Sequence, residues 1–459
     1  MRREIILFAH NILTVHRVAV EFMQQNGDKM EKLVIHGGKP LFGDIEVSGM
    51  KNAALPIILA SILIDDKCVI ENIPNVSDVS LAFEIIQSMG GAVRLLNKTT
   101  VEIDTRGVVQ GIAPYELVRR MRGSYYIVGA ELGRFGRGKV GLPGGCDLGV
   151  RPIDQHIKGF EALGAEVTIE SGHIEAVANM PLKGSNIYFD AVTVGGTMNV
   201  MIAATKAKGV TVIENAAREP HIVDLANFLN TCGAKISGAG TDTIKITGVE
   251  KLRGCTYAII PDMIEAGTYM IAAAVTGGRL CVKNVIPKHL ESISAKMEEM
   301  GITVEEGDDC VTVYRNTDNL SRINLKTLPY PGFPTDMGPQ MCVLMCQAQG
   351  VSLLNEGIFS NRFRYVDELR RMGACIKVDD RTAIIEGGLP LSAANLRAVD
   401  LRAGAAVVLA GLIANGRTEI EDIYHIERGY DNLVEKLRGV GANIKKVTLP
   451  DPSVYDKAL

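Results

Sequence analysis

The sequence has no long hydrophobic run and no excess of positive charge. No stretch of its 459 residues approaches the roughly 20 apolar residues of a membrane-spanning helix. The formal net charge is −4, which argues against a nucleic-acid-binding protein, because such proteins usually carry a basic face. Apolar residues make up 47% and charged residues 22%, the balance of a folded globular protein. One ordinary hydrophobic core does not suffice at this length, so we expect two domains.

The nine cysteines lack the density and the even number of a disulfide framework in a secreted protein. Most of them lie within apolar runs, far apart in the sequence. Cys342 and Cys346 stand four apart on an expected helix, but no histidine or second cysteine pair lies nearby, which disfavours a metal site there. We therefore expect buried thiols in a reducing cytoplasm, without a metal or a cofactor.

Residues 1–29 differ from the rest of the chain. The segment Met1–Ala9 hints at a signal peptide, but its apolar run is short and no small-residue cleavage site follows. Met30 then opens the segment Glu31–Gly38, which is typical of a first strand. We interpret residues 1–29 as an upstream extension or a start-site artefact and expect them to be disordered.

One order of elements recurs six times, with a period of about 70 residues. Each unit reads as an apolar helix, a strand with a polar end, an amphipathic helix and a glycine turn into another strand. The polar strand ends are Val69–Asn72, Val140–Pro143, Val212–Asn215, Val282–Asn284, Leu353–Asn355 and Ile420–Asp422. The turn glycines, 68 to 74 residues apart, are Gly90, Gly164, Gly233, Gly301, Gly373 and Gly441.

This repeat predicts the fold class. Three units make a domain of about 200 residues, so six units predict two similar α/β domains that divide near Tyr257–Ile260. The first helix of a unit, such as Ala53–Ala60, is apolar on all sides and belongs in the interior, whereas the second, such as Tyr430–Leu437, has one apolar stripe. We expect two inside-out domains of three repeats each, with buried helices surrounded by sheets.

Charged side chains recur where the helices of these units begin. The cations are Lys51, Arg122 and Arg402 at the apolar helices, and Arg151, Arg362 and Arg428 at the amphipathic ones. Acidic side chains also stand at the starts of such helices, where a structural role does not require them. They include Asp262, Asp336 and Asp400. Helix N-termini attract anions, and arginine offers paired donors to phosphate or carboxylate.

Any single one of these cations is more often a solvated charge or half of an ion pair. Six of them at equivalent ends of equivalent units would instead converge on one cleft between the domains, the usual place for a ligand. The sequence therefore predicts a ligand with two or three negative charges.

Cys146 differs from the other cysteines because it ends the loop Leu142–Cys146 and is followed closely by Arg151. An exposed thiol near a guanidinium has a lowered pKa and becomes reactive. A purely structural loop cysteine is the alternative. The loop has neither the Lys-Ser/Thr of a P-loop nor a dinucleotide-binding glycine pattern.

The segments that surround these residues resemble one family, the UDP-N-acetylglucosamine 1-carboxyvinyltransferases among the enolpyruvyl transferases. They are Ser48–Pro56, Leu142–Cys146, Arg151–Ile157, Glu214–Pro220, Phe333–Met337, Asn361–Phe363, Asp400–Arg402 and Tyr424–Tyr430. The resemblance covers about residues 30–447. It implies transfer of the enolpyruvyl group of phosphoenolpyruvate to the 3′-hydroxyl of UDP-N-acetylglucosamine with release of phosphate, the first committed step of peptidoglycan synthesis. It further implies a cytoplasmic enzyme, inhibition by fosfomycin, and domains of residues 51–258 and of residues 30–50 with 259–459.

The resemblance also implies roles for individual residues in an addition followed by an elimination. The catalytic residues would be Cys146 as acid, Asp336 as base and Lys51. The residues that bind phosphoenolpyruvate would be Lys51, Asn52, Arg122, Arg151, Arg402 and Arg428, with Arg362 in support. The residues that bind UDP-N-acetylglucosamine would be Asn52, Arg122, Arg151, Pro152, Ile153, Asp154, Gln155, Thr193, Val194, Gly195, Asp336 and Ile358.

Several positions depart from the family pattern. Tyr126 stands where tryptophan is frequent, Ala191 where a lysine often precedes the uridine contacts, and Met263 where arginine occurs. His221 and Ser360 stand where glutamate is common. These departures concern binding and leave the acid, the base and the central cations in place.

Two alternatives remain open. The first is the sister enolpyruvyl transferase that acts on shikimate phosphate, which does not need the loop with Cys146. The second is a catalytically silent relative that binds the nucleotide sugar. A silent copy would be expected to lose Asp336 or Cys146, and both residues are present.

Overall fold

The computed structural model describes residues 31–111, 113–142, 152–317 and 319–448, and these residues form six sheets. The strand order of three sheets is β13-β3-β5-β4 (Thr256–Ala258, Lys67–Glu71, Val101–Asp104, Ala92–Leu95), β6-β8-β7 (Arg137–Gly141, His173–Ala178, Ala165–Glu170) and β11-β12-β10-β9 (Lys235–Ser237, Thr243–Thr247, Val210–Glu214, Asn186–Tyr188). The others are β15-β16-β14-β2 (Ile302–Glu306, Cys310–Arg315, Arg279–Lys283, Phe42–Glu46), β17-β19-β21-β20 (Leu320–Ser321, Ala348–Asn355, Thr382–Gly387, Cys375–Asp379) with β18 (Asn324–Lys326) beside β19, and β22-β23-β1-β24 (Asn395–Arg397, Arg417–Glu421, Glu31–His36, Asn443–Thr448).

Four of the polar strand ends of the repeat, at Asn72, Asn215, Asn284 and Asp422, are left-handed turns. Asn72, Asn215 and Asn284 follow strands β3, β10 and β14 with φ between 55° and 56°, a conformation that asparagine tolerates better than most residues. Each amide also donates to a backbone carbonyl of a neighbouring segment, at Ile259, Phe189 and Val47 respectively, over 2.7 to 2.8 Å. The recurring asparagine therefore ties the end of its strand to a neighbouring segment.

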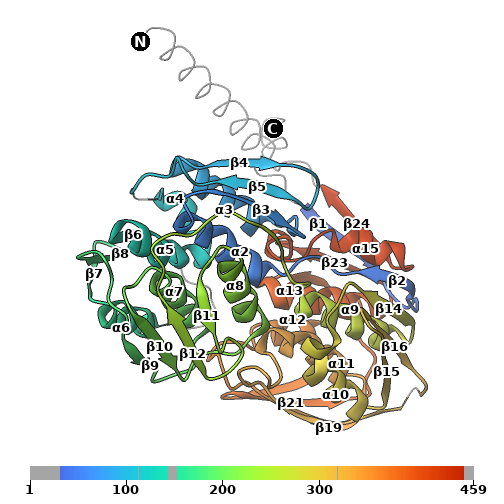
Figure 1. Cartoon of the computed structure of the whole chain (residues 1–459). Coiled ribbons are helices and arrows are strands. Elements are labelled where there is room, and N and C mark those ends of the chain that lie inside the picture. The colour runs from blue at the N-terminus through green and yellow to red at the C-terminus, as the bar shows by residue number, and fades with distance from the viewer. Residues whose placement is uncertain (1–30, 112, 143–151, 318, 449–459) are drawn as a thin grey trace, which may run out of the picture.

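Six apolar helices lie inside these sheets (Figure 1). They are α2 (Lys51–Ala60), α5 (Tyr126–Phe135), α7 (Val194–Ala204), α9 (Met263–Thr276), α11 (Gly338–Met345) and α13 (Leu401–Ile413). Helix α9 is buried from Met263 to Val275, and α9, α11 and α13 contact one another. A helix surrounded by other elements must be apolar on every side, which is the pattern that the sequence shows. The predicted fold class, buried helices surrounded by sheets, is confirmed.

The remaining helices follow the strands or connect them. They are α3 (Ser77–Ser88), α4 (Tyr115–Val118), α6 (Asp154–Ala162), α8 (Pro220–Thr231), α10 (Glu291–Glu299), α12 (Tyr365–Arg371), α14 (Tyr424–Glu427) and α15 (Leu433–Gly439), with short 3₁₀ turns η1 (Ser61–Leu63), η2 (Arg122–Tyr125), η3 (Pro287–Leu290) and η4 (Thr335–Met337). The helix expected over residues 430–437 begins only at Leu433, because Asn432 has a φ of 50° and cannot continue a right-handed helix. Among the described residues, no helix combines the length and apolar character that crossing a membrane requires.

The first described strands of the chain complete sheets built mainly from its end. Strand β1 lies between β23 and β24 and is antiparallel to both, and β2 is parallel to β14 (Figure 1). Strand β13 is parallel to β3 in a sheet built from early residues. Strands β1 and β2 therefore belong to sheets formed mainly by the second half of the sequence, and β13 belongs to a sheet formed by the first half. The expectation of disorder for residues 1–29 falls outside the described residues.

Candidate active site

A buried carboxylate, Asp78 on α3, links two of the predicted cations. Lys51, the first residue of α2, donates from Nζ to Asp78 Oδ2 over 3.1 Å. Arg428, directly after α14, donates from Nε to Asp78 Oδ1 over 2.9 Å. Burial alone would raise the pKa of Asp78, but the two cations outweigh it and hold the pKa below its ordinary value. Asp78 therefore stays charged and fixes both cations.

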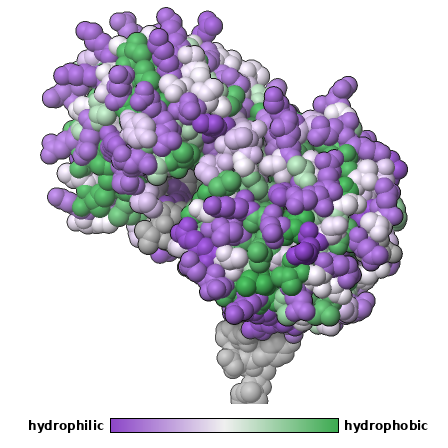
Figure 2. Space-filling model, turned by 90° about the horizontal axis from the view of Figure 1, so that it is seen from below, coloured by the Kyte–Doolittle hydropathy of each residue, from purple (hydrophilic) through white to green (hydrophobic). Residues whose placement is uncertain are grey.

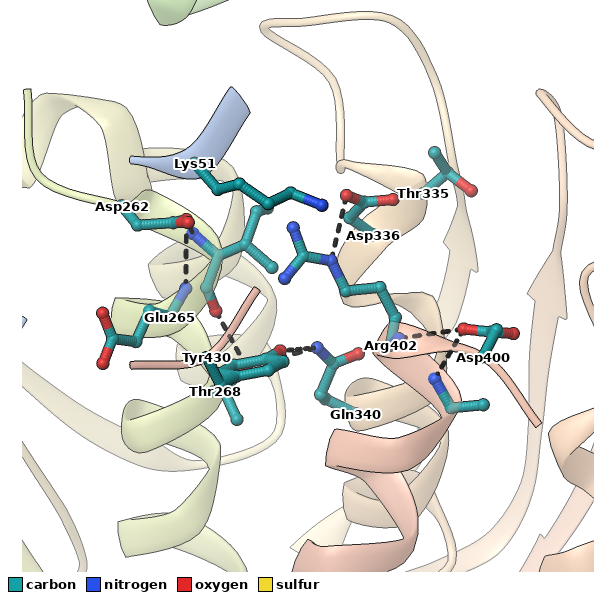
Figure 3. Close-up of polar contacts among 12 residues, drawn as sticks. Lys51, Asp262, Glu265, Thr268, Thr335, Asp336, Gln340, Asp400, Arg402 and Tyr430 are labelled. Carbon is teal, nitrogen blue, oxygen red and sulfur yellow. Dashed lines mark hydrogen bonds and ion pairs between the residues drawn. The ribbon is translucent and has the colours of Figure 1, made fainter. Parts of the chain in front are cut away.

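A second carboxylate, Asp336 in η4, accepts hydrogen bonds from two other predicted cations. Arg402 Nε donates to its Oδ2 over 3.1 Å, and Arg362 Nη2 donates to its Oδ1 over 3.2 Å. Burial would raise the pKa of Asp336, but Arg402, Arg362 and Lys51 lower it far below its ordinary value. Lys51 acts on Asp336 through space, and its side chain points toward Asp336 (Figure 3). Because Lys51 also pairs with Asp78, the two carboxylates belong to one site.

This site has donors that the protein itself does not use. Arg402 Nη1 and Arg362 Nε are buried, and no hydrogen-bond partner faces either atom within the described part of the chain. A buried donor without a partner is costly unless a ligand satisfies it. The space-filling view shows two lobes with a hollow where they meet (Figure 2). The arrangement is that of a binding site for an anion.

Beneath the cations lies a buried polar network. Tyr430 Oη is 2.9 Å from Thr268 Oγ1 and accepts from Gln340 Nε2 over 3.1 Å, and the ring of Tyr430 lies under the guanidinium of Arg402 (Figure 3). These residues come from α9, α11 and the turn after α14. The network fixes Arg402 from below while Asp336 holds it from the side.

The acidic residues at the other helix starts have a structural role, contrary to the expectation from the sequence. Asp262 accepts from the backbone N–H groups of Ile264 and Glu265 and caps α9. Asp400 accepts from the N–H groups at the start of α13 in the same way. Such side chains satisfy the unpaired donors of a helix N-terminus. Asp336 caps no helix, which separates it from these two.

The residues expected to hold the nucleotide gather where α6 and α7 begin. Gln155 on α6 is buried, and its Oε1 accepts from Asp190 N over 2.9 Å. Thr193 caps α7 by accepting from Gly196 N over 3.3 Å. A Cβ on Gly195 would lie 3.0 Å from His156 Nε2, so the two helix starts are in close contact. Pro152, Ile153, Asp154 and Val194 lie beside these residues in the chain.

His156 also lies in this region, and no role for it was predicted from the sequence. Its Nδ1 lies 3.0 Å from Asn199 Nδ2. Burial, and secondarily the charge of Arg122, lowers the pKa of His156 to about 4. The imidazole is therefore neutral near pH 7, and Arg122 at the start of η2 lies close enough to act on it.

Two further positions concern the nucleotide sugar: Ala191, where the family pattern has a lysine, and Ile358, the last residue of the expected set. Lys158 on α6 donates to both carboxylate oxygens of Asp190 over 2.8 Å, so an ammonium group lies next to Ala191. The backbone N–H of Ile358 donates to Glu356 over 2.8 Å, and Glu356 in turn accepts from Thr335, beside Asp336.

The structure brings together four of the six predicted cations, Lys51, Arg362, Arg402 and Arg428. Arg122 and Asn52 are half-buried at the starts of η2 and α2. Cys146 and Arg151 fall in residues 143–151, outside the described residues, so their roles stay predictions. Sequence reasoning missed Asp78, because one acidic residue in the first turn of a helix is common and carries no further signal.

Comparisons with known proteins show the family of the chain. The sequence model of the EPSP synthase family, 3-phosphoshikimate 1-carboxyvinyltransferase, matches residues 35–437. The chain is 56% identical over 418 residues to UDP-N-acetylglucosamine 1-carboxyvinyltransferase 3 of Caldanaerobacter subterraneus, a match that covers 91% of this chain and 100% of the relative. It is 55% identical to UDP-N-acetylglucosamine 1-carboxyvinyltransferase of Clostridium botulinum, over 91% of this chain and 100% of the relative.

Solved structures share the fold. The enolpyruvyl transferase NikO from Streptomyces tendae superposes with a TM-score of 0.83 at 25% identity, covering 92% of this chain and 100% of that one. EPSP synthase from Acinetobacter baumannii gives a TM-score of 0.70 at 18% identity, covering 91% and 100% of the two chains, and so supports the fold alone.

Proposed function

The chain belongs to the UDP-N-acetylglucosamine 1-carboxyvinyltransferase family, and from this premise we propose that it transfers the enolpyruvyl group of phosphoenolpyruvate to the 3′-hydroxyl of UDP-N-acetylglucosamine. Phosphate is the second product. One observation carries the proposal most directly: two groups of cations around two carboxylates, Asp78 and Asp336, lie side by side and share Lys51. The reaction needs both an anion site and a base, and these two groups supply one each.

The anion site consists of Lys51, Arg428 and the unused donor of Arg402. Phosphoenolpyruvate carries a phosphate and a carboxylate, and paired guanidinium donors suit both. Arg122 and Arg151 add to this field in our proposal. The same cations stabilise the charge of the tetrahedral intermediate that forms after addition.

Asp336 is the base on the sugar hydroxyl. Its carboxylate is 28% exposed, so a hydroxyl group can reach it. In the free protein Arg402 and Arg362 hold the pKa of Asp336 low, which makes it a weak base. Bound phosphate and carboxylate offset part of that positive field and raise the pKa of Asp336 when the substrates are in place. The hydroxyl oxygen then attacks the enol carbon of phosphoenolpyruvate.

Cys146 is the acid that protonates the methylene carbon during addition. Elimination then removes a proton from that carbon and phosphate from the neighbouring carbon, which restores the double bond. We predict that fosfomycin, an epoxide that resembles phosphoenolpyruvate, alkylates Cys146. Peptide mass spectrometry of the treated protein measures this directly. A label on another of the nine cysteines, with Cys146 unmodified, would contradict the assignment.

The uridine diphosphate binds at the starts of α6 and α7. Backbone N–H groups at helix N-termini favour phosphate, and Thr193 and Gly195 leave little side-chain bulk there. We further propose that Lys158, beside Ala191, supplies the ammonium contact that other members of the family take from a lysine at that position.

We propose that residues 51–258 form one domain, and residues 30–50 together with 259–459 the other. Closure of the two on the substrates would exclude water from the reactive intermediate. The activity would serve the first committed step of peptidoglycan synthesis in the cytoplasm, with phosphoenolpyruvate and UDP-N-acetylglucosamine as its small-molecule substrates.

An assay of phosphate release tests the proposed function. The purified chain is incubated with phosphoenolpyruvate and either UDP-N-acetylglucosamine or shikimate 3-phosphate. We expect phosphate only with the nucleotide sugar. Release with shikimate 3-phosphate alone would make the chain the sister transferase, and tight binding of the nucleotide sugar without turnover would make it a silent relative.

A further inference from the structure

Three cysteines outside the active site bring their sulfur atoms together. The Sγ atoms of Cys68, Cys232 and Cys255 all lie within 4.8 Å of one another, and those of Cys232 and Cys255 are 3.4 Å apart. Cys68 and Cys232 are fully buried, whereas Cys255 is partly exposed. Among the described residues, no other group of three histidine, cysteine or acidic side chains lies close enough together to hold a metal ion.

The backbone fixes all three positions. Cys68 lies within β3, opposite Ile103 of β5. Cys255 stands directly before β13, and its carbonyl accepts from Val69 N over 2.8 Å. Cys232 ends α8, and its carbonyl accepts from Arg253 N over 2.9 Å. The thiols therefore converge from a helix and two paired strands, and little rearrangement is needed to use them together.

The spacing of these sulfur atoms suits a single metal ion. Zinc–thiolate bonds of about 2.3 Å in tetrahedral geometry place the sulfur atoms roughly 3.8 Å apart, within the range found here. Two other cysteine pairs lack a third member among the described residues. They are Cys342 on α11 with Cys346 directly after it, and Cys281 on β14 with Cys310 on β16. The three-cysteine group thus differs in kind from buried thiols that only fill space.

We propose that Cys68, Cys232 and Cys255 bind one zinc ion, a site that the sequence did not predict. Three thiolates and one divalent ion leave a single negative charge, and a water molecule takes the fourth position from the open side at Cys255. The three S–H groups lose their protons to solvent when the ion binds.

Zinc at this site ties α8, β3 and β13 together. The segment that follows Cys255 leads into α9, and Tyr257 on it donates to Asp224 on α8 over 2.6 Å. The ion would therefore stabilise the place where the chain passes from one half of the molecule to the other, without contact with the reacting groups.

Metal titration of the full chain, reduced and stripped of metal, tests the proposal. Zinc is added in competition with a chelator of known affinity, and Co²⁺ replaces zinc in a parallel sample for absorption spectra. We expect one ion per chain, thiolate-to-cobalt charge-transfer bands, and a thermal midpoint that rises with zinc. Cys255→Ser should weaken binding by more than about 100-fold, because it removes a direct ligand.

Cys281→Ser is the matched control, since it alters a thiol pair of similar exposure and should bind zinc as the unaltered chain does. All of these proteins retain Cys146, so any zinc bound by its thiol contributes equally to each titration and does not affect the comparison. Cys232→Ala provides a second test should Cys255→Ser fold poorly. The proposal is overturned if the reduced chain binds no zinc, if Cys255→Ser binds it equally well, or if the cysteines only form a disulfide on oxidation.

Discussion

Asp78 and Asp336 each accept hydrogen bonds from two cations, but the two groups face the solvent in opposite ways. In the first group the carboxylate is 6% exposed and the cation Arg428 is 31% exposed. In the second the carboxylate is 28% exposed, and its partners Arg362 and Arg402 are 2% and 3% exposed. The first trio therefore exposes a cation, and the second exposes a carboxylate while Arg402 keeps one buried donor for the anion. The same residue types yield an anion site or a base according to which member is buried.

The largest effect is expected when the exposed carboxylate is neutralised. Asp336→Asn keeps the shape of the side chain but removes the base, and a positioned base contributes about 10²- to 10⁴-fold to a rate. We expect kcat for phosphate release to fall about 10³-fold. Asp367→Asn is the control and should retain full activity. The side chain of Asp367 is 75% exposed and pairs with Arg370 of the same helix, α12.

Removing the exposed cation should affect binding more than the chemical step. Arg428→Gln loses a charge-assisted contact worth about 1.5–3 kcal/mol. KM for phosphoenolpyruvate should therefore rise roughly 10- to 100-fold, while KM for UDP-N-acetylglucosamine changes little. Steady-state kinetics with each substrate varied in turn measure both values, and an equal rise in the two would count against a local anion site.

The buried carboxylate should matter for stability. Asp78→Asn leaves Lys51 and Arg428 without a negative partner at that position, and we expect the free energy of unfolding to fall by about 2 kcal/mol. Asp104→Asn, in a more exposed pair with Arg106, should cost less than about 1 kcal/mol. Denaturant titration of the two variants compares them, and equal losses would refute the distinction.

The smallest effect concerns the pH dependence of the free energy of unfolding, through His156 in the nucleotide region. The pKa of His156 is about 4 in the folded chain and 6.5 in the unfolded one, so acid protonates the unfolded state first and favours it. Between pH 7 and pH 5.5 this residue should lower the free energy of unfolding by about 1 kcal/mol. His156→Asn should lose that part of the pH dependence, whereas a change at the partly exposed His173 should keep it.

The repeat made most of the fold predictable from the sequence. Turn glycines and several of the polar strand ends recur because the units use the same left-handed turns, as Asn72 and Asn215 show. The cations were predictable for the same reason, since Lys51 and Arg402 occupy equivalent helix starts. Asp262 was not distinguishable from a catalytic carboxylate, because a capping role depends on backbone geometry that the sequence does not state.

Contacts between segments far apart in the sequence could not be predicted from it. Asp78 meets Arg428 across 350 positions, and no local pattern links them. Cys68 within β3 and Cys232 at the end of α8 likewise lie far apart in the sequence, and their sulfur atoms meet in the fold. Such pairs follow from the arrangement of whole elements, so they emerge only once the fold is known.

Equilibrium binding of phosphoenolpyruvate by isothermal titration calorimetry tests the central contrast most directly, with the unaltered chain, Arg428→Gln and Asp336→Asn compared side by side. If the exposed cation forms the anion site, Arg428→Gln should bind at least about tenfold more weakly. Asp336→Asn, which removes a nearby negative charge, should bind at least as tightly as the unaltered chain. Loss of binding in Asp336→Asn with normal binding in Arg428→Gln would contradict the assignment of the two groups.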